Sequence, residues 1–362
     1  MIDPEEQQAQ VRMSQLPPEA IGEDELDRPQ PADDPVDHIV GGDLLSMMRK
    51  TVDRLERDRT AVGDLKILSR TIRELRYAFK VFRPYRRRRK VTIFGSARTP
   101  QEHVDFQTAE ALGRELALHG WMVITGAGGG IMEAGHKGAG RDVSMGLNIM
   151  LPFEQQSNPY IEGDHKLVTL KYFFTRKLMF VKETSAIVCC PGGFGTLDEM
   201  FEVITLLQTG KQTMMPVVLL DSPGGSYWSD LGHFMQKHLL HTGMISQEDV
   251  HLFKITDSVQ TAVGEILGFY RVYHSMRYVA DRLVLRLTQR LPETLLQQIK
   301  DEYSDILLSG TFSQSGPLPE ESAEVELRGL TRLVFHFDRK ALGRLRMLIN
   351  TINDHARAPQ SR

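Results

Sequence analysis

The stretch Cys190-Pro191-Gly192-Gly193-Phe194-Gly195-Thr196-Leu197-Asp198-Glu199 decides the fold of this chain. It follows the apolar run 186–189, which is typical of a buried strand, and it leads into residues 200–204, which continue as a helix. Glycines at such a corner let the backbone approach a ligand closely and turn its N–H groups toward an anion. The N-terminus of the helix adds partial positive charge. The stretch therefore predicts an anion cradle with the carboxylate of Glu199 beside it.

Strands and helices alternate regularly on both sides of this corner. The expected strands are 91–94, 122–125, 144–149, 167–170, 186–190 and 217–220. The expected helices are 106–118, 131–139, 175–182, 197–208 and 228–238. Such alternation predicts an α/β fold, Rossmann-like, with a doubly wound parallel sheet that binds ligands at the carboxyl ends of its strands.

The rest of the chain divides into three further regions. Residues 1–40, with eleven acidic and two basic side chains, are expected to be a disordered tail. Residues 41–90 are expected to form helices broken at Gly63, followed by a basic stretch at 83–90. This stretch is either a patch that binds nucleic acid or phosphate or, as we favour, a solvated linker that closes on acidic neighbours. The α/β domain then spans 91–270. A C-terminal α+β unit, 271–362, shows two strand–helix repeats: 282–287 with 293–307, and 332–337 with 340–352.

Composition excludes several classes of protein. The net charge of −3 hides a mildly basic body, with a net charge of +6 outside residues 1–40, and this is too weak a signal to indicate nucleic acid. No run of about 18 apolar residues predicts a membrane span. The acidic N-terminus does not resemble a signal peptide. The adjacent Cys189 and Cys190 are expected to be buried, reduced thiols, which predicts a cytoplasmic protein. His136, His165 and His241 lack metal-ligand spacing, so we expect no metal.

Two other strand ends are also rich in glycine or hydroxyl groups. Gly95-Ser96-Ala97-Arg98 closes the strand 91–94, and Gly126-Ala127-Gly128-Gly129-Gly130 closes the strand 122–125. Three such ends at one sheet edge favour a binding site, because packing alone does not require them. The second loop lacks G-x-G-x-x-G with an acidic partner, and no G-x-x-x-x-G-K-[ST] occurs, so neither a dinucleotide fold nor a P-loop is predicted.

Two interpretations of Glu199 remain open on local sequence. Thr196-x-x-Glu199 fits a capping box, in which Glu199 would bond only the N-cap amide. Alternatively, Glu199 acts on a ligand in the cradle, and Arg176 in the preceding helix grips its phosphate. The alternative to phosphate binding by Arg176 is that Arg176 and Lys177 form a solvent-exposed basic pair on the helix surface. For the aromatic residues Tyr172, Phe173 and Phe174, we favour core packing over stacking on a base. For the apolar residues Leu178, Met179 and Val181, we favour core packing over a cofactor-binding role.

These residues resemble the Lonely Guy (LOG) family, formerly labelled lysine decarboxylase-like. Pro191–Glu199 match every fixed position of its P-G-G-x-G-T-x-x-E signature, and Arg176-Lys177 match its basic pair, 199 − 176 = 23 residues upstream. Residues 126–134 resemble its G-G-G-x-G-I-M-E-A loop, with Ala127 in place of one glycine. The resemblance covers roughly residues 90–265, so the chain is expected to be an extended member.

The resemblance implies an N-glycosidase, AMP nucleosidase-like, that hydrolyses a nucleoside 5′-monophosphate of a purine or modified purine to free base and ribose 5-phosphate. It implies Glu199 and Arg176 as catalytic residues, with Glu199 stabilising an oxocarbenium-like ribose. The implied substrate-binding residues are Gly192, Gly193, Gly195, Thr196, Lys177, Ser96, Gly128, Gly129 and Gly130.

We expect no cofactor, because the sequence lacks a pyridoxal constellation and gives no support to decarboxylation. A homodimer or larger assembly is expected, partly from the resemblance and partly from the apolar stripes of the N-terminal helices. Membrane and nucleic-acid partners are not expected. The alternative function is a non-catalytic nucleotide-binding or phosphorylated-cofactor carrier protein of the same fold.

Overall fold

A computed structural model describes residues 42–151, 156–322 and 324–356 of the chain. The predicted acidic tail, 1–40, lies outside these ranges. The chain divides into a first unit that ends at Tyr77 and a second unit that spans residues 78–362.

The described part of the first unit is helical. It contains α2 (Gly42–Arg57) and most of α3 (Val62–Phe82). The predicted break at Gly63 is wrong, because Gly63 lies in the first turn of α3. The chain turns instead over residues 58–61, where Arg59 has a left-handed φ of 53°.

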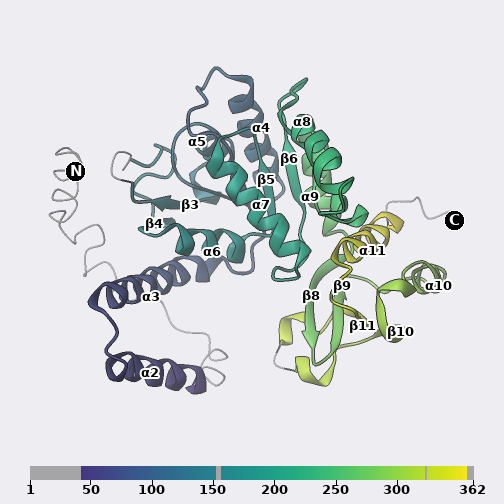
Figure 1. Ribbon diagram of the computed structural model, residues 1–362. Helices are drawn as coiled ribbons and strands as arrows, with labels where there is room; N and C mark the ends of the chain where they lie inside the picture. Colours follow the sequence, from purple (N-terminus) through teal and green to yellow (C-terminus); the bar gives the residue numbers. More distant parts are fainter. Residues whose placement is uncertain (1–41, 152–155, 323, 357–362) are drawn as a thin grey trace, which may run out of the picture. The chain divides into compact units, whose positions relative to one another are not determined.

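A seven-stranded parallel sheet forms the centre of the second unit (Figure 1), with the strand order β4-β3-β2-β1-β5-β6-β7. The order reverses between β1 and β5, and ligands bind at such a switch point in open α/β sheets. The predicted doubly wound α/β fold is confirmed. The strands are β1 (Lys90–Phe94), β2 (Met122–Thr125), β3 (Ser144–Ile149), β4 (Leu167–Leu170), β5 (Ala186–Cys189), β6 (Val217–Leu220) and β7 (Lys254–Thr256).

Helices cover both faces of this sheet. Val91 and Ile93 of β1 belong to the core shared with α4 (Val104–Leu118), α5 (Ile131–Ala139) and α9 (Val259–Phe269). Phe94 instead contacts Phe180 of α6 (Phe173–Glu183), with ring centroids 4.9 Å apart. Because successive strand residues point to opposite faces, α6 lies across the sheet from α4. The remaining helices are α7 (Phe194–Gln208) and α8 (Tyr227–Phe234), which continues into the π-helical segment Met235–Leu240.

The C-terminal region forms an antiparallel sheet in the order β10-β11-β9-β8, with each pair of strands followed by a helix. The predicted helix 293–307 is too long: it ends at Glu302, and Leu307 begins a strand. Within that strand only Phe312 is buried, so no alternating pattern marks it in the sequence. The elements are β8 (Tyr273–Val279), β9 (Arg282–Leu287), α10 (Glu293–Glu302), β10 (Leu307–Ser315), β11 (Thr331–Phe337) and α11 (Leu342–His355).

Helix α11 joins the C-terminal region to the α/β sheet by packing against α9. Arg346 forms an ion pair with Glu265 of α9. The side chain of Asn353 accepts hydrogen bonds from the amides of Val272 and Tyr273, at 2.9 and 3.0 Å. The segment that connects the parallel sheet to the antiparallel sheet is therefore held by α11.

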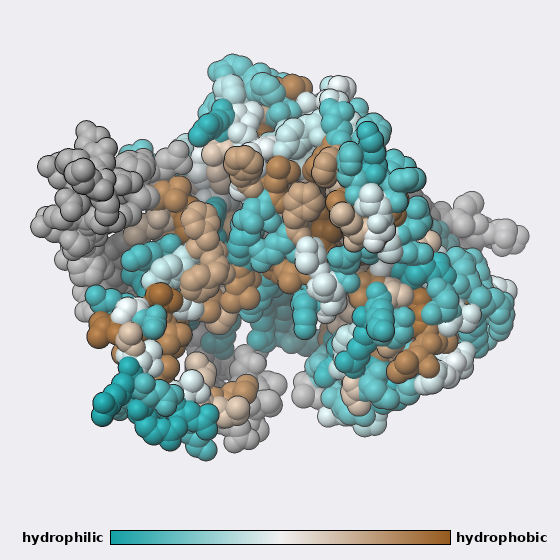
Figure 2. Space-filling view, viewed as in Figure 1, coloured by the Kyte–Doolittle hydropathy of each residue, from teal (hydrophilic) through white to brown (hydrophobic). Residues whose placement is uncertain are grey.

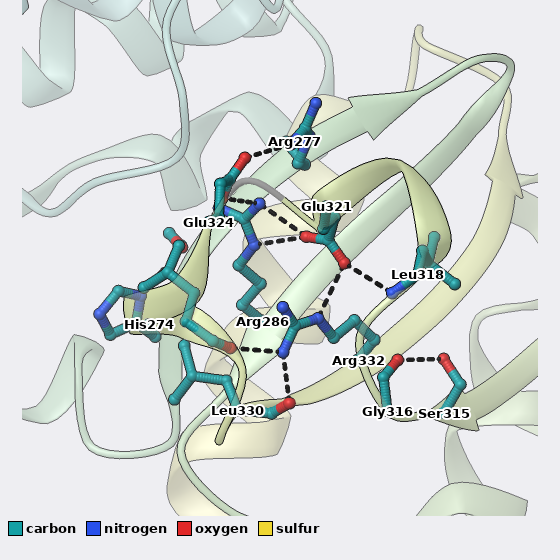
Figure 3. A network of polar contacts seen from close by, with 12 residues as sticks. His274, Arg277, Arg286, Ser315, Gly316, Leu318, Glu321, Glu324, Leu330 and Arg332 are labelled. Carbon is teal, nitrogen blue, oxygen red and sulfur yellow. Dashed lines mark hydrogen bonds and ion pairs between the residues drawn. The ribbon is translucent and has the colours of Figure 1, made fainter. Parts of the chain in front are cut away.

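A buried ion network ties the segment before β11 to the antiparallel sheet (Figure 3). Glu321 is 1% exposed. It accepts hydrogen bonds from Arg286 at 2.6 and 2.8 Å, from Arg332 at 2.9 Å and from the Leu318 amide at 3.1 Å. Burial alone would raise the pKa of Glu321, but these donors outweigh it and lower the pKa to about 2.

The basic linker closes on acidic and polar neighbours. Arg87 pairs with Glu326, and the buried Lys90 lies 3.6 Å from Glu183. Arg89 donates to the His274 carbonyl at 2.8 Å. These contacts match the interpretation that we favoured for the linker.

The two cysteines are free and buried, as predicted. Within the described ranges, no helix combines the length and the hydropathy needed to cross a bilayer.

Candidate active site

Three loops meet at the switch point of the parallel sheet. The Ser96 amide, just after β1, donates to the Pro191 carbonyl in the loop after β5 at 3.1 Å. The Ser96 carbonyl accepts from the Ile131 amide, which follows the glycine loop after β2, at 3.0 Å. Backbone hydrogen bonds thus hold the glycine-rich strand ends together at one edge.

Two glycines permit this close approach. Gly130 has a φ of 63°, and a Cβ there would lie 2.3 Å from the Ser96 carbonyl oxygen. A Cβ on Gly192 would lie 2.2 Å from the Thr196 hydroxyl oxygen and 2.9 Å from the Ser96 nitrogen. Any larger residue at either position would push the loops apart.

Asn158 and His136 support the loop after β2, and sequence reasoning did not identify this role. The Asn158 amide donates to the Ala127 carbonyl at 2.8 Å, and its side chain donates to the Gly128 carbonyl at 3.0 Å. His136 is fully buried and lies 3.1 Å from the Thr125 hydroxyl. Burial lowers the pKa of His136 to about 4, so it is a neutral support.

Helix α7 begins three residues earlier than predicted, and this decides how Glu199 is held. Its N-cap is Gly193, whose carbonyl accepts from the amides of Thr196 and Leu197 at 3.0 and 3.2 Å. Thr196 is therefore inside the helix, and Glu199 lies in the second turn, beyond reach of the N-cap amide. The capping-box interpretation of Thr196 and Glu199 is wrong. The first amides of α7, including those of Phe194 and Gly195, have no intrahelical acceptor, as the predicted cradle requires.

Glu199 is a buried carboxyl group with an unpaired oxygen. Its side chain is 7% exposed, and its Oε2 has no hydrogen-bond partner among the residues that the structure describes. Burial raises the pKa of Glu199 to about 7, while the positive charges of Lys177 and Arg176 oppose the shift. A perturbed carboxyl group of this kind in a ligand cradle is typical of a functional site.

Arg176 lies against the loop after β2 and within electrostatic reach of Glu199. Its Nε donates to the Leu147 carbonyl in β3 at 2.8 Å, and its Nη2 lies 2.2 Å from where a Cβ of Gly126 would stand. Burial lowers the pKa of Arg176 to about 10, and the charge of Glu199 opposes this shift. Arg176 is therefore charged at neutral pH and packed against the loop.

Lys177 is held by acidic side chains of α7. Its ammonium pairs with Asp198 at 2.8 Å and with Glu202, both on α7. These pairs join α6 to α7 beside the cradle. The basic pair thus divides into an arginine held at the loops and a lysine held by acidic groups.

Apolar side chains over α6 and α7 are exposed (Figure 2), which the sequence did not predict. Core packing was expected for Phe173, Phe174 and Leu178, but they are 55%, 53% and 47% exposed. Only the side of α6 that carries Met179 and Phe180 faces the sheet. Phe194, at the start of α7, is 92% exposed.

Comparison with known proteins locates the similarity within the α/β region. The family described as "Possible lysine decarboxylase" matches residues 128–266. A probable cytokinin riboside 5′-monophosphate phosphoribohydrolase of Oryza sativa subsp. japonica is 32% identical, over 44% of this chain and 63% of that protein. The chain thus spans less than two thirds of this relative.

Two other proteins are also similar to about half of the chain. The cytokinin riboside 5′-monophosphate phosphoribohydrolase of Mycobacterium tuberculosis is 26% identical, over 46% of this chain and 88% of its own length. Among solved structures, the molybdenum cofactor carrier protein of Chlamydomonas reinhardtii is 21% identical with a TM-score of 0.35, over 50% of this chain and 99% of that one.

Proposed function

Because the α/β region of this chain carries a LOG-family segment, we propose that the protein hydrolyses the N-glycosidic bond of a nucleoside 5′-monophosphate to free base and ribose 5-phosphate. The observation that carries the proposal is Glu199, a buried carboxyl group with one unpaired oxygen beside an anion cradle. A carboxylate that only capped the helix would accept a hydrogen bond from a backbone amide at that oxygen.

The 5′-phosphate binds at the N-terminus of α7 in this proposal. The amides of Gly193, Phe194 and Gly195 lack intrahelical acceptors, and the helix dipole favours an anion there. The close approach of Gly192 to Thr196 and Ser96 supports a site built around backbone groups. Gly128 and Gly129, in the loop after β2, form the opposite wall.

Glu199 acts on the ribose in its ionised form. The bond between C1′ and the base nitrogen breaks, and its electron pair leaves with the base. The carboxylate stabilises the positive charge that develops on the sugar ring. A water oxygen then bonds to C1′, and one of its protons passes to Glu199 and on to the nitrogen of the departed base, which restores the carboxylate. Burial strengthens the charge stabilisation, because solvent screening is weak there.

Arg176 binds the phosphate or assists the departing base. Its guanidinium is charged, buried and fixed by the Leu147 carbonyl, so little side-chain entropy is lost on binding. Lys177 has a smaller role, because Asp198 and Glu202 already hold its ammonium.

The base is a purine or a modified purine in this proposal. The rice and mycobacterial relatives are named for cytokinin riboside 5′-monophosphates, whose base is a modified adenine. Neither relative exceeds 32% identity, so adenosine monophosphate and its N6-substituted forms are the first substrates to compare.

A substrate panel tests the function. The purified full chain is incubated with adenosine, guanosine, cytidine and uridine 5′-monophosphates and an N6-isopentenyl derivative, and free base and ribose 5-phosphate are measured. The matching nucleosides serve as controls for phosphate recognition. We expect release from at least one purine nucleotide and far slower release from its nucleoside. Binding without release from any nucleotide would favour the carrier alternative.

We also propose that two or more copies of the chain associate. The support is the exposed apolar surface over α6 and α7, including Phe173, Phe174 and Phe194, together with exposed apolar residues on α2 such as Leu44 and Met47. Light scattering at micromolar concentration should give a mass above that of one chain. A single monomeric peak would contradict this part of the proposal.

A further inference from the structure

Tyr227, the first residue of α8, lies beside the loop after β5 (residues 190–193, here the motif loop). Its preceding strand, β6, pairs in parallel with β5, so the turn after β6 and the loop after β5 leave the sheet at the same edge. The Tyr227 hydroxyl donates a hydrogen bond to the Gly192 carbonyl oxygen at 2.6 Å. Helix α8 and the motif loop are therefore directly joined.

The surroundings of Tyr227 fix its ring. The buried carboxylate of Asp221 accepts a hydrogen bond from the Trp228 amide at 3.0 Å and anchors the first turn of α8. The Tyr227 ring meets Trp228 edge-on, with centroids 4.8 Å apart and planes at 88°. Trp228 is fully buried, so the phenol hydroxyl approaches Gly192 from a rigid base.

The hydrogen bond controls the direction of one amide. The described residues contain no cis peptide bond, so the peptide between Gly192 and Gly193 is trans and planar. Its carbonyl and its N–H then point in opposite directions. When Tyr227 holds the Gly192 carbonyl, the Gly193 N–H is turned away from α8. Two successive glycines have little conformational preference of their own, so an outside contact must set this orientation.

We propose that Tyr227 is a positioning residue for phosphate binding: it holds the Gly192 carbonyl and so presents the Gly193 amide to the anion at the N-terminus of α7. The inference rests on the proposed function, which supplies that anion as a 5′-phosphate. Tyr227 does not touch the reacting bond. It acts through the backbone of the cradle, so phosphate affinity depends on it more than the chemical step does.

Tyr227→Phe tests the inference, because it removes the hydroxyl and keeps the ring on Trp228. The matched control is Tyr270→Phe. The Tyr270 hydroxyl donates to the Ser185 carbonyl, also at 2.6 Å, but Ser185 precedes β5 and so lies at the opposite edge of the sheet. Both variants lose the same kind of hydrogen bond. Binding of ribose 5-phosphate to the full chain is measured by calorimetry, and thermal unfolding and steady-state kinetics are recorded for both.

We expect Tyr227→Phe to weaken ribose 5-phosphate binding about five- to tenfold, the effect of one hydrogen bond. KM for the nucleotide should rise by the same factor, and kcat should change less than about twofold. Tyr270→Phe should bind ribose 5-phosphate like the wild type, although its melting temperature falls.

The failures of the two proposals are distinguishable. If the wild type binds ribose 5-phosphate and hydrolyses nucleotides, but Tyr227→Phe binds equally well, Tyr227 has no positioning role and the function stands. If Tyr227→Phe and Tyr270→Phe weaken binding equally, the effect is general destabilisation and the inference is overturned. If the wild type neither binds ribose 5-phosphate nor releases it, both proposals fall together.

Discussion

Two buried glutamates, Glu199 and Glu321, show how the same side chain acquires opposite properties in one protein. Glu199 is 7% exposed, has an unpaired oxygen, and has a pKa raised to about 7. Glu321 is 1% exposed, and two arginines and an amide hold its two oxygens, so its pKa falls to about 2. Burial acts on both carboxyl groups, and the supply of donors decides the direction of the shift.

The difference separates a group available for chemistry from a group committed to structure. Glu321 fastens the segment before β11 to β9 and β11 and has no oxygen left for a ligand (Figure 3). Glu199 has positive neighbours in Arg176 and Lys177, but both cations are also bound elsewhere. A substrate in the cradle would supply the hydrogen-bond partner that the free oxygen of Glu199 lacks.

The largest expected effect is on turnover. Glu199→Gln removes the negative charge that stabilises the ribose, so we expect kcat to fall by about 10³-fold, with nucleotide binding retained. Glu110→Gln, on the outer helix α4, is the control, because the ion pairs of its carboxylate among the described residues are with Arg114 and Lys137. Ribose 5-phosphate release is the measurement. Full activity of Glu199→Gln would remove Glu199 from the mechanism.

The next effect is on stability. Glu321→Gln removes the ion-pair partner of the buried Arg332 and leaves Arg286 paired with Glu324 alone, so we expect a loss of about 3 kcal/mol or more in the free energy of unfolding. The control Glu320→Gln alters a partly exposed pair with Arg282 and should change it by about 0.5 kcal/mol or less. Urea unfolding of both variants measures the difference. Equal effects would show that the network adds no special stability.

A smaller effect on stability depends on pH. The folded state holds a proton on Glu199 up to about pH 7, whereas an unfolded glutamate ionises near pH 4.3. Stability contributed by that protonated state is fully present below about pH 4.3 and is lost as the pH rises from there to about 7. Glu199→Gln lacks this loss and should exceed the wild type by about 2 kcal/mol at pH 8, with little difference at pH 4. Unfolding measured at both pH values would contradict the raised pKa if the difference were constant.

The smallest expected effect concerns the placement of Arg176. Gly126→Ala places a methyl group where Nη2 of Arg176 lies, and the flexible side chain must shift. We expect kcat/KM to fall about tenfold. Gly264→Ala, in α9, meets nothing within 4 Å and is the matched control. If Gly126→Ala kept wild-type kinetics, the observed position of Arg176 would not matter for activity.

The sequence identified Glu199 as a candidate site residue but gave no indication of the ion network around Glu321. Glycines, strand ends and the spacing of Arg176 and Glu199 marked the α/β site, because local backbone needs constrain those residue types. Glu321 gave no signal, since its partners come from distant strands and only tertiary contacts unite them. Tyr227 escaped for the same reason: its hydrogen bond joins residues 35 positions apart.

The start of α7 shows a second limit. The sequence from Thr196 to Glu199 fits the local pattern of a capping box, but the helix begins at Phe194 with Gly193 as its N-cap. The preceding Gly192 is closely approached by Thr196 and Ser96, a tertiary contact that local sequence does not reveal. The sequence also did not reveal that Phe173 and Phe174 are exposed, because their apolar character predicted core packing. Helical periodicity identifies an apolar face but does not say whether the same chain covers it.

The pH dependence of ribose 5-phosphate release by the wild-type chain tests the central claim most directly. We predict that kcat/KM for a purine nucleoside 5′-monophosphate rises with pH and levels off above about pH 7, as the buried carboxyl group of Glu199 ionises. The second ionisation of the substrate phosphate, near pH 6, is located separately by titrating the nucleotide. No release at any pH, or a rate that is highest in acid and falls through about pH 7, would contradict the account.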